Sequence, residues 1–509
     1  MRKNIFIVFT LATALFANAQ QKNTLLDQSF WKTTPDVTAV QAEIAKGCNP
    51  SESNDRAFDP VVLAINNDAP NATIKFLLEQ PGNGVDKMTH DNRIYLHWAA
   101  SKGNVEIIKY LIAKGSNVNL EDSHSAFPIT AAASSGQKNT AVYDAFFKAG
   151  IDPKRKYQDG ANLLLMAVAF DKDLTLTNYF VSKGMSLKDV DSEGNTAFNY
   201  AARTGNIALL KTLLEKGVKY TDNALIFAAQ GSRRESNTLE TYKYLVEDLK
   251  IKPTATNKEG QNVLHSLVTK AKQTEIISYF LSKGTDVNKA DNDGNTPLMI
   301  AASGRENNGS LEQLLAITKN INTQNKKGES ALTKAIQSGT TEAATLLLEK
   351  GADVKVLDKD GNNLGFYLVD SYRPQMQGMG GMGRGPENGN AQKQDPFAAK
   401  AKLLQDKGLN LAAPQKNGST LYHFAVAKND LALLKKLSNL NIDINAKNKD
   451  GLTALHKAAM ISKDDAILKY LLSVGANKEI KTDFDETPFA LAKENESLSK
   501  NKVSIDFLK

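Results

Sequence analysis

The sequence contains a single cysteine, Cys48, so no disulfide bond can form within the chain. Aromatic residues make up only 7% of it, and tryptophan occurs twice, which favours many small cores over one deep core. It also lacks the sequence motifs of zinc proteases, serine hydrolases and P-loop proteins, and it has no spaced cysteine–histidine cluster. Packing between side chains must therefore hold the fold together, and no enzyme class is indicated by a motif.

Basic residues exceed acidic ones by 7, but the lysines are scattered along the chain. There is no basic block and no alternation of basic and aromatic residues, so the composition argues against a nucleic-acid partner. A chain of 509 residues is large for one compact domain, which favours several domains or an array of repeats.

The first residues have the pattern of a secretory signal peptide. Arg2 and Lys3 form a basic start, an apolar run follows from Ile5 to Phe16, and Ala17-Asn18-Ala19 is a small-x-small cleavage site. No other segment is long and apolar enough to span a membrane. We expect cleavage after Ala19 and a mature protein in the periplasm or outside the cell.

Glycines recur through the chain with a spacing of 33 or 34 residues, or about twice that. A spacing of 57 residues between Gly361 and Gly418 corresponds to one unit plus an insertion. Such a period indicates stacked helical units that bury their apolar faces against their neighbours. The aligned glycines are Gly160, Gly194, Gly260, Gly294, Gly328, Gly361, Gly418 and Gly451.

Two units carry the repeat most clearly. Residues 291–322 begin DNDGNTPLMIAAS, and residues 448–477 contain Gly451, Thr453, Leu455-His456 and Ala458-Ala459 at matching positions. Both resemble the consensus of the ankyrin-repeat family. The resemblance implies an all-α solenoid of helix–turn–helix units joined by β-hairpin turns, with about twelve repeats plus terminal caps.

The expected organisation follows from the repeat and its interruptions. Residues 1–19 are the signal peptide, 20–54 a linker and capping half-repeat, 55–372 and 397–480 ankyrin repeats, 373–396 a flexible insertion rich in glycine and methionine, and 481–509 a C-terminal cap with a polar tail.

Several residue types have structural roles in this pattern. We expect Thr196, Thr296, Thr453 and Thr487 to cap the first helix of their units, with Pro297 and Pro488 at its first position. Glycines after the first helix (Gly103, Gly136, Gly205 and Gly339) are expected in the left-handed conformation. The family resemblance implies that four histidines support the turns by hydrogen bonding, namely His97, His265, His423 and His456.

The resemblance further implies a non-catalytic scaffold that binds a protein along a concave surface of turn tips and first helices. The chain is expected to be a monomer without a cofactor. The candidate contact residues are the variable positions of turns and first helices: Asn92, Arg93, Ser101, Lys102, Ser192, Glu193, Arg203, Thr204, Asn292, Asp293, Lys359, Asp360, Lys449 and Asp450.

Two other functions stay open. Met376, Met379 and Met382 are spaced by three in the insertion, and their thioether groups suit Cu(I), although the composition favours a flexible low-complexity loop over a metal site. A hydrolase site assembled only in space is the other alternative, since a Ser-His-Asp arrangement needs no sequence motif.

Overall fold

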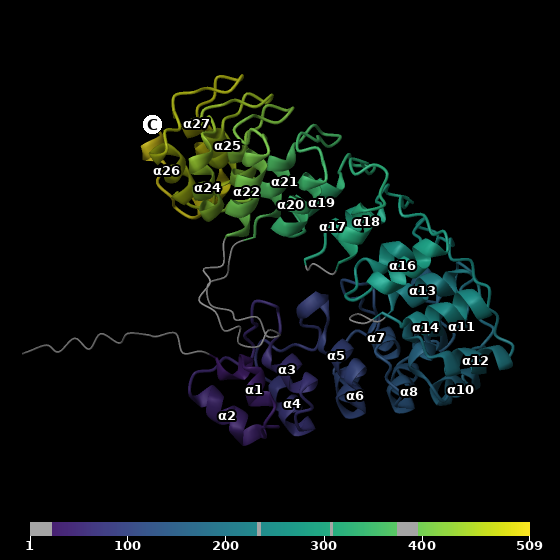
Figure 1. Cartoon of the computed structure of the whole chain (residues 1–509). Helices are drawn as coiled ribbons and strands as arrows, with labels where there is room; N and C mark the ends of the chain where they lie inside the picture. The colour runs from purple at the N-terminus through teal and green to yellow at the C-terminus, as the bar shows by residue number, and fades with distance from the viewer. Residues whose placement is uncertain (1–22, 232–235, 306–308, 374–394) are drawn as a thin grey trace, which may run out of the picture. The chain divides into compact units, whose positions relative to one another are not determined.

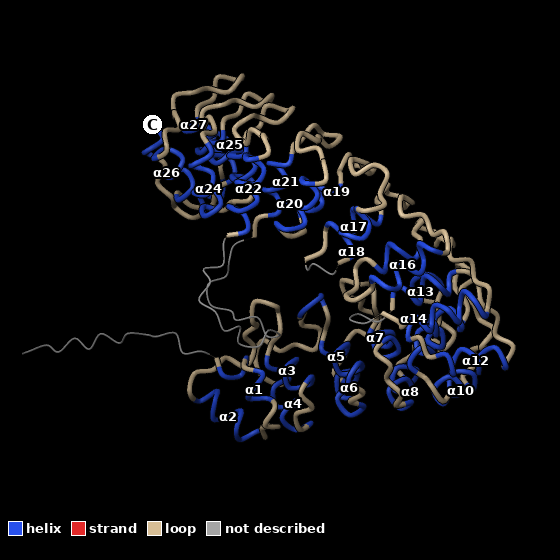
Figure 2. Tube along the Cα trace, viewed as in Figure 1, coloured by secondary structure: helices blue, strands red, loops and turns tan. Residues whose placement is uncertain are grey.

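The computed structural model describes residues 23–231, 236–305, 309–373 and 395–509, and throughout this part the regular secondary structure is helical (Figures 1 and 2). No strand is formed by the described residues. One isolated β-bridge joins Val190 to Thr196. The turns between the described repeats, expected to be β-hairpins, therefore contain no strands. A single bridged pair of residues across a turn is too short to form a strand ladder.

The helices come in pairs. Within each of the two compact units described below, the first helix of a pair packs on its second helix and on the first helix of the next pair, and several neighbouring second helices also pack on one another. The first helices are α3 (Pro60–Asn66), α5 (Tyr95–Lys102), α7 (Pro128–Ser134), α9 (Leu163–Ala167), α11 (Ala197–Ala201), α13 (Asn223–Gln230), α15 (Val263–Leu267), α17 (Pro297–Ala302), α19 (Ala331–Gln337), α21 (Leu364–Ser371), α23 (Leu421–Ala427), α25 (Ala454–Ile461) and α27 (Pro488–Glu494).

The second helices carry an apolar stripe, which in many units is rich in leucine. They are α2 (Val37–Ala45), α4 (Asn71–Leu78), α6 (Val105–Ala113), α8 (Thr140–Lys148), α10 (Thr175–Ser182), α12 (Ile207–Glu215), α14 (Leu239–Lys243), α16 (Thr274–Ser282), α18 (Ser310–Leu315), α20 (Thr341–Glu349), α22 (Pro396–Asp406), α24 (Leu431–Leu437), α26 (Ala466–Ser473) and α28 (Glu496–Lys500). A π-helix (Tyr244–Asp248) continues α14. The 3₁₀ turns are η1 (Thr24–Leu26), η2 (His90–Asn92), η3 (Gln158–Gly160), η4 (Val168–Phe170), η5 (Ala202–Thr204), η7 (Ser438–Leu440) and η8 (Asp506–Leu508).

The chain divides into two compact units. Of the described residues, those from 23 to 202 together with 206–221 form the first unit, and 203–205 with those from 222 to 509 form the second. In both units the core lies between neighbouring helix pairs. Alanines of the first helices, such as Ala100 and Ala459, are fully buried, and so are leucines of the second helices, such as Leu213 and Leu471. Alanine allows close approach of the first helices because its side chain adds little bulk.

Two details differ from the sequence-based expectation. Gly339 does not adopt a positive φ, unlike Gly103, Gly136 and Gly205. A Cβ atom on Gly339 would lie 2.1 Å from the carbonyl oxygen of Ala302, so glycine is required there by close packing against the preceding first helix rather than by a left-handed turn.

Thr196 is the second difference, because its side chain does not cap α11. Its hydroxyl group instead donates to the carbonyl oxygen of Lys219 at 2.6 Å and lies 3.0 Å from Asn199 Oδ1. The hydroxyls of Thr296, Thr453 and Thr487 do accept a backbone N–H in the first turn of their helices.

Both ends of the described chain are folded onto the array. Trp31 of α1 (Gln28–Trp31) is fully buried and donates from Nε1 to the carbonyl oxygen of Leu25 at 2.8 Å. At the other end, Leu498 of α28 and Leu508 of η8 are buried. The segment expected as a polar tail is thus part of the terminal cap, because these two leucines anchor it.

None of the helices in the described residues combines the length and the apolar character that crossing a bilayer requires.

Candidate functional site

The turns between units share one hydrogen-bonding scheme. In the turn that begins at Asp291, the backbone N–H of Asp291 donates to the carbonyl oxygen of Asn295 at 2.9 Å. The Asp291 carboxylate accepts the N–H groups of Asp293 and Asn295 at 3.0 and 2.8 Å, which closes the turn from inside. The same backbone closure occurs in the turns that begin at Asn54, Thr89, Asp122, Tyr157, Asp191, Asn257, Asn325, Asp358, Gln415, Asn448 and Thr482.

Neighbouring turns are also joined to each other. The backbone N–H of Lys326 donates to the carbonyl oxygen of Asp293 in the preceding turn at 2.8 Å. Gly294 permits this approach, since its φ is +85° and a Cβ atom there would lie 2.9 Å from the Lys326 nitrogen. The backbone of such a turn tip is therefore held both by the hydrogen bonds within its own turn and by the hydrogen bond to the turn before it.

The four turn histidines bridge consecutive units or cap their own helix. In His423, Nδ1 accepts the N–H of Thr420 at 3.1 Å, so the proton of the neutral ring is on Nε2, which donates to the carbonyl oxygen of Leu452 at 2.9 Å. His97 and His265 make the equivalent bonds. In His456, Nδ1 accepts the N–H of Thr453 at 3.2 Å. Burial lowers the pKa of all four rings below its ordinary value, so they are neutral at pH 7.

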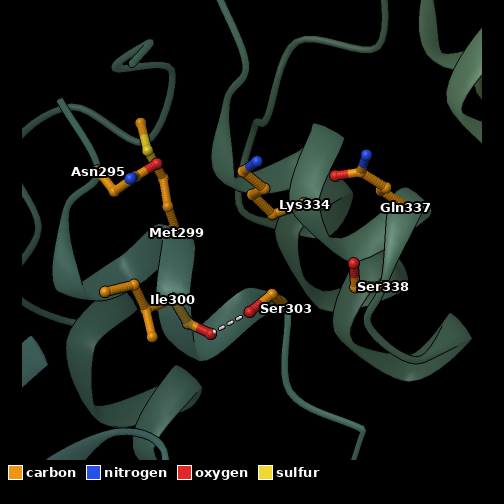
Figure 3. A pocket seen from close by; sticks show the side chains of 7 residues that line it. All are labelled: Asn295, Met299, Ile300, Ser303, Lys334, Gln337 and Ser338. Carbon is orange, nitrogen blue, oxygen red and sulfur yellow. Dashed lines mark hydrogen bonds between the residues drawn. The ribbon is translucent and has the colours of Figure 1, made fainter. Parts of the chain in front are cut away.

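A hollow of about 260 Å³ lies between two neighbouring first helices, α17 and α19 (Figure 3). Met299 and Ile300 form its apolar side. The remaining lining is polar, and Ser303 is held by a hydrogen bond of 2.7 Å to the Ile300 carbonyl oxygen. The full lining is Asn295, Met299, Ile300, Ser303, Lys334, Gln337 and Ser338.

Lys334 is the one charged group of this lining, and it has a partner. Its amino group lies 2.5 Å from Oε2 of Glu329, whose side chain is 5% exposed. Burial raises the pKa of Glu329, but hydrogen bonds from Lys334 and Asn325 hold that pKa below its ordinary value. The hollow is therefore nearly neutral, with apolar and hydrogen-bonding groups side by side. It is smaller than most small-molecule pockets and matches the size of one or two side chains.

Several predicted contact residues are committed to neighbours in the fold. The Arg93 guanidinium donates to the buried Asp122 carboxylate at 2.8 Å and lies over the Trp98 ring at 5.1 Å. Lys102 pairs with Asp68 at 2.7 Å. Five more predicted residues make single contacts with neighbours. The Ser101 carbonyl oxygen accepts from Ser135, and the Glu193 N–H donates to Asp191. The side chains of Ser192 and Asn292 donate to the carbonyl oxygens of Asp159 and Lys258, and Arg203 lies over the Phe227 ring.

Other predicted residues lie at exposed turn tips. The side chains of Lys359, Asp360, Lys449, Asp450 and Asp293 are exposed to solvent, and Asn92 is exposed with a positive φ. Thr204 is not at a tip, since it lies half-buried in η5 directly after α11. The structure adds Lys326, Lys327 and Lys416, which occupy equivalent exposed tips and were not predicted. Aligning the turns on Gly328 and Gly418 reveals them in the sequence. The hollow gave no such signal, because it depends on how α17 and α19 pack.

Met376, Met379 and Met382 lie outside the described residues. Within the described ranges, no group of three or more histidine, cysteine, aspartate or glutamate side chains is arranged to hold a metal ion.

Helix pairs with stacked turns define a helical repeat protein. Sequence profiles described as "Ankyrin repeats (3 copies)" match residues 34–122, 129–224 and 225–315, and a profile described as "Ankyrin repeats (many copies)" matches residues 422–472. These matches cover more than half of the chain, which therefore belongs to the ankyrin-repeat family. Members of this family are generally non-catalytic scaffolds, and their repeats imply protein partners.

Similar proteins include human neurogenic locus notch homolog protein 1, which is 31% identical over 222 residues, and its zebrafish (Danio rerio) counterpart, 31% identical over 220 residues. Human SH3 and multiple ankyrin repeat domains protein 2 is 28% identical over 232 residues. These alignments cover 40–45% of the present chain but only 8–11% of each relative, so the likeness concerns the repeats alone.

Proposed function

We propose that this chain is a non-catalytic scaffold that binds a protein partner along the face formed by its first helices and turn tips. The observation that carries the proposal is the hollow between α17 and α19, with an apolar side of Met299 and Ile300 beside polar groups. Protein interfaces commonly take most of their binding energy from a few side chains that fill such pockets, surrounded by contacts that exclude water.

The rigidity of the surrounding surface supports this function. The turns are closed by their own hydrogen bonds and most of them are joined to the preceding turn, so a partner meets a surface whose backbone is already ordered. A preordered surface loses little conformational entropy on binding, which favours affinity. The likeness to the repeats of neurogenic locus notch homolog protein 1 and of SH3 and multiple ankyrin repeat domains protein 2 also favours a protein-binding function.

The proposal includes a location in the bacterial envelope or outside the cell. It rests on residues 1–19 alone, whose basic start, apolar run and Ala17-Asn18-Ala19 site have the order of a cleaved signal peptide. N-terminal sequencing of the protein purified from its source tests this part. A mature chain that starts at Gln20 supports export, and an uncleaved chain in the cytoplasmic fraction contradicts it.

Binding is tested with a pair of matched substitutions. Ile300→Asp places a charge in the hollow, whereas Ile317→Asp makes the same change after α18, where Ile317 is 44% exposed and outside the hollow. The wild-type chain is used to capture a partner from envelope extract, and the affinity of each variant for that purified partner is then measured. Loss of binding by Ile300→Asp alone supports the proposal, and equal binding by both variants contradicts the assigned surface.

A further inference from the structure

Lysines form a column along the turn tips of the second unit. In four consecutive turns, the residue after the turn's first position is lysine: Lys326, Lys359, Lys416 and Lys449. Lys327 adds a fifth at the first of these tips. Their side chains are exposed, and none of the five amino groups forms an ion pair or a hydrogen bond with another described residue.

The backbone of this column is continuous across the insertion. The N–H of Lys359 donates to the Lys327 carbonyl oxygen at 3.0 Å, that of Lys416 to Gly361 at 3.3 Å, and that of Lys449 to Asn417 at 2.9 Å. The turns lie on one side of the helices in this unit (Figure 2). Each lysine is therefore held at a fixed register beside the next, with its charged end in solvent.

The tips of the first unit have the opposite character. At the two central positions of its turns they carry Asp55, Asp91, Asp159 and Glu193, with Arg56 as the one lysine or arginine. From residue 326 to residue 450, the corresponding positions carry five lysines against two aspartates, Asp360 and Asp450. The basic column is thus local to one part of the array and does not reflect a uniform surplus of lysine.

We propose that the lysine column of the second unit, defined as Lys326, Lys327, Lys359, Lys416 and Lys449, binds an extended acidic polypeptide segment of the partner. This inference rests on the proposed scaffold function and names the chemistry of the partner. Charge complementarity carries it, because five exposed ammonium groups in a row attract carboxylates spaced along a chain.

The spacing fits a polypeptide. Neighbouring helices pack at 8–10 Å, and an extended chain advances about 3.3 Å per residue, so about three residues of the partner span one turn tip to the next. Asp360 and Asp450 interrupt the lysines at two of the four tips, which fits carboxylates spaced along a polypeptide better than the continuous phosphates of a nucleic acid. Leu357, 51% exposed before the second tip, offers an apolar contact that a polypeptide also satisfies.

The experiment measures the affinity of the full chain for a fluorescent peptide of about 15 residues with glutamate at every third position. One variant carries Lys326→Gln, Lys359→Gln, Lys416→Gln and Lys449→Gln. The control carries Lys319→Gln, Lys350→Gln, Lys407→Gln and Lys435→Gln, which removes four exposed lysines associated with the second helices. Both variants have the same net charge, so general attraction to the peptide is equal in them.

We expect the tip variant to bind the acidic peptide about tenfold more weakly than wild type at low salt, and the control to stay within about twofold. Equal weakening in both variants would show that net charge alone is responsible and would overturn the inference. So would tighter binding of a single-stranded oligonucleotide of equal charge through the same lysines.

The result is separable from the scaffold proposal. A captured partner that depends on Ile300 but not on the column would leave the proposed function standing and remove only this inference. If the peptide binds through the lysine column but the chain captures no protein through Ile300, the column stands as a peptide-binding surface and the assigned scaffold surface is overturned.

Discussion

The phenolic hydroxyl group of Tyr179 donates a hydrogen bond of 2.8 Å to Oδ1 of Asp144, which lies on the preceding second helix. Lys183, one helical turn after Tyr179, donates to the same oxygen at 2.9 Å and lies 5.0 Å from the centre of the Tyr179 ring. This cluster joins α8 to α10 outside the apolar core. The same arrangement joins the π-helix after α14 to α16 through Tyr279, Lys283 and Glu247.

Replacing Tyr179 with phenylalanine is expected to lower the free energy of unfolding by about 1 kcal/mol, because a hydrogen bond to a charged, partly exposed acceptor is lost. Tyr470→Phe is the matched control, since its hydroxyl donates at 3.3 Å to a neutral acceptor, the Leu434 carbonyl oxygen. We expect about 0.5 kcal/mol for that change. Urea denaturation followed by circular dichroism measures both, and equal losses would contradict a special role for the charged cluster.

Lys400 makes a different connection between repeats. Its side chain, on α22 just after the insertion, is buried, and its amino group donates to the carbonyl oxygens of Ala335, Ile336 and Gly339 at 3.0, 2.9 and 2.8 Å. The first two carbonyls belong to the last turn of α19, where helical partners are missing, and the third lies two residues beyond the helix.

Lys400→Met is expected to destabilise the protein by about 2 kcal/mol, because it leaves buried carbonyl groups without donors. The control is Lys402→Met, two residues further on. Lys402 is exposed and, among the described residues, pairs with Asp406 of its own helix alone, so its loss is expected to cost less than about 0.5 kcal/mol. The melting temperatures of the two variants test this difference in stability. Similar melting temperatures would show that the contacts of Lys400 with the carbonyl groups contribute little.

Gly339 illustrates what the sequence predicts and what it does not. Its place after a first helix is the same as that of Gly103, and the repeat pattern correctly indicates glycine there. The reason differs, since Gly103 needs its φ of +79° whereas Gly339 needs the absence of a Cβ atom next to Ala302. Local pattern predicts helices, turns and their glycines, but a contact with the preceding repeat depends on packing.

The candidate contact residues also show that contacts between neighbouring repeats are not predicted by the local sequence pattern. The turn position of Arg93 predicts an exposed side chain, yet the Asp122 carboxylate of the next turn engages it. Lys359 and Lys449 occupy comparable turns and form no ion pair with any residue that the structure describes. The sequence identifies which residues stand at turn tips, and the neighbouring turn decides which of them are available to a partner.

Gly339→Ala is accordingly expected to cost about 2 kcal/mol or more, within the range of about 1–3 kcal/mol that forced overpacking usually costs. Gly351→Ala provides the comparison, because Gly351 has a φ of +90° and a Cβ atom added there would meet nothing within 4 Å. Its cost is backbone strain alone, about 1 kcal/mol. Equal denaturation midpoints would contradict the close contact with Ala302.

The buried turn histidines predict a dependence of stability on pH. Burial lowers the pKa of His97, His265, His423 and His456 in the folded state, whereas an unfolded histidine titrates near about 6.5. Below pH 6.5 the unfolded chain therefore binds more protons at these sites than the folded chain does. Stability then rises with pH in this window, and it falls as the pH drops from about 6.5 toward the folded pKa values.

We expect the melting temperature to be nearly constant from about pH 7 to 8 and to decrease from about pH 6.5 to 5, above the range in which most carboxylates titrate. His423→Gln removes one of the four groups and should reduce the slope in this window by roughly a quarter, although it also lowers the stability at pH 7. The control is His124→Gln, because the His124 side chain is 60% exposed and lies at a turn tip. A slope unchanged by His423→Gln, or reduced equally by His124→Gln, would show that the buried rings do not set the acid sensitivity.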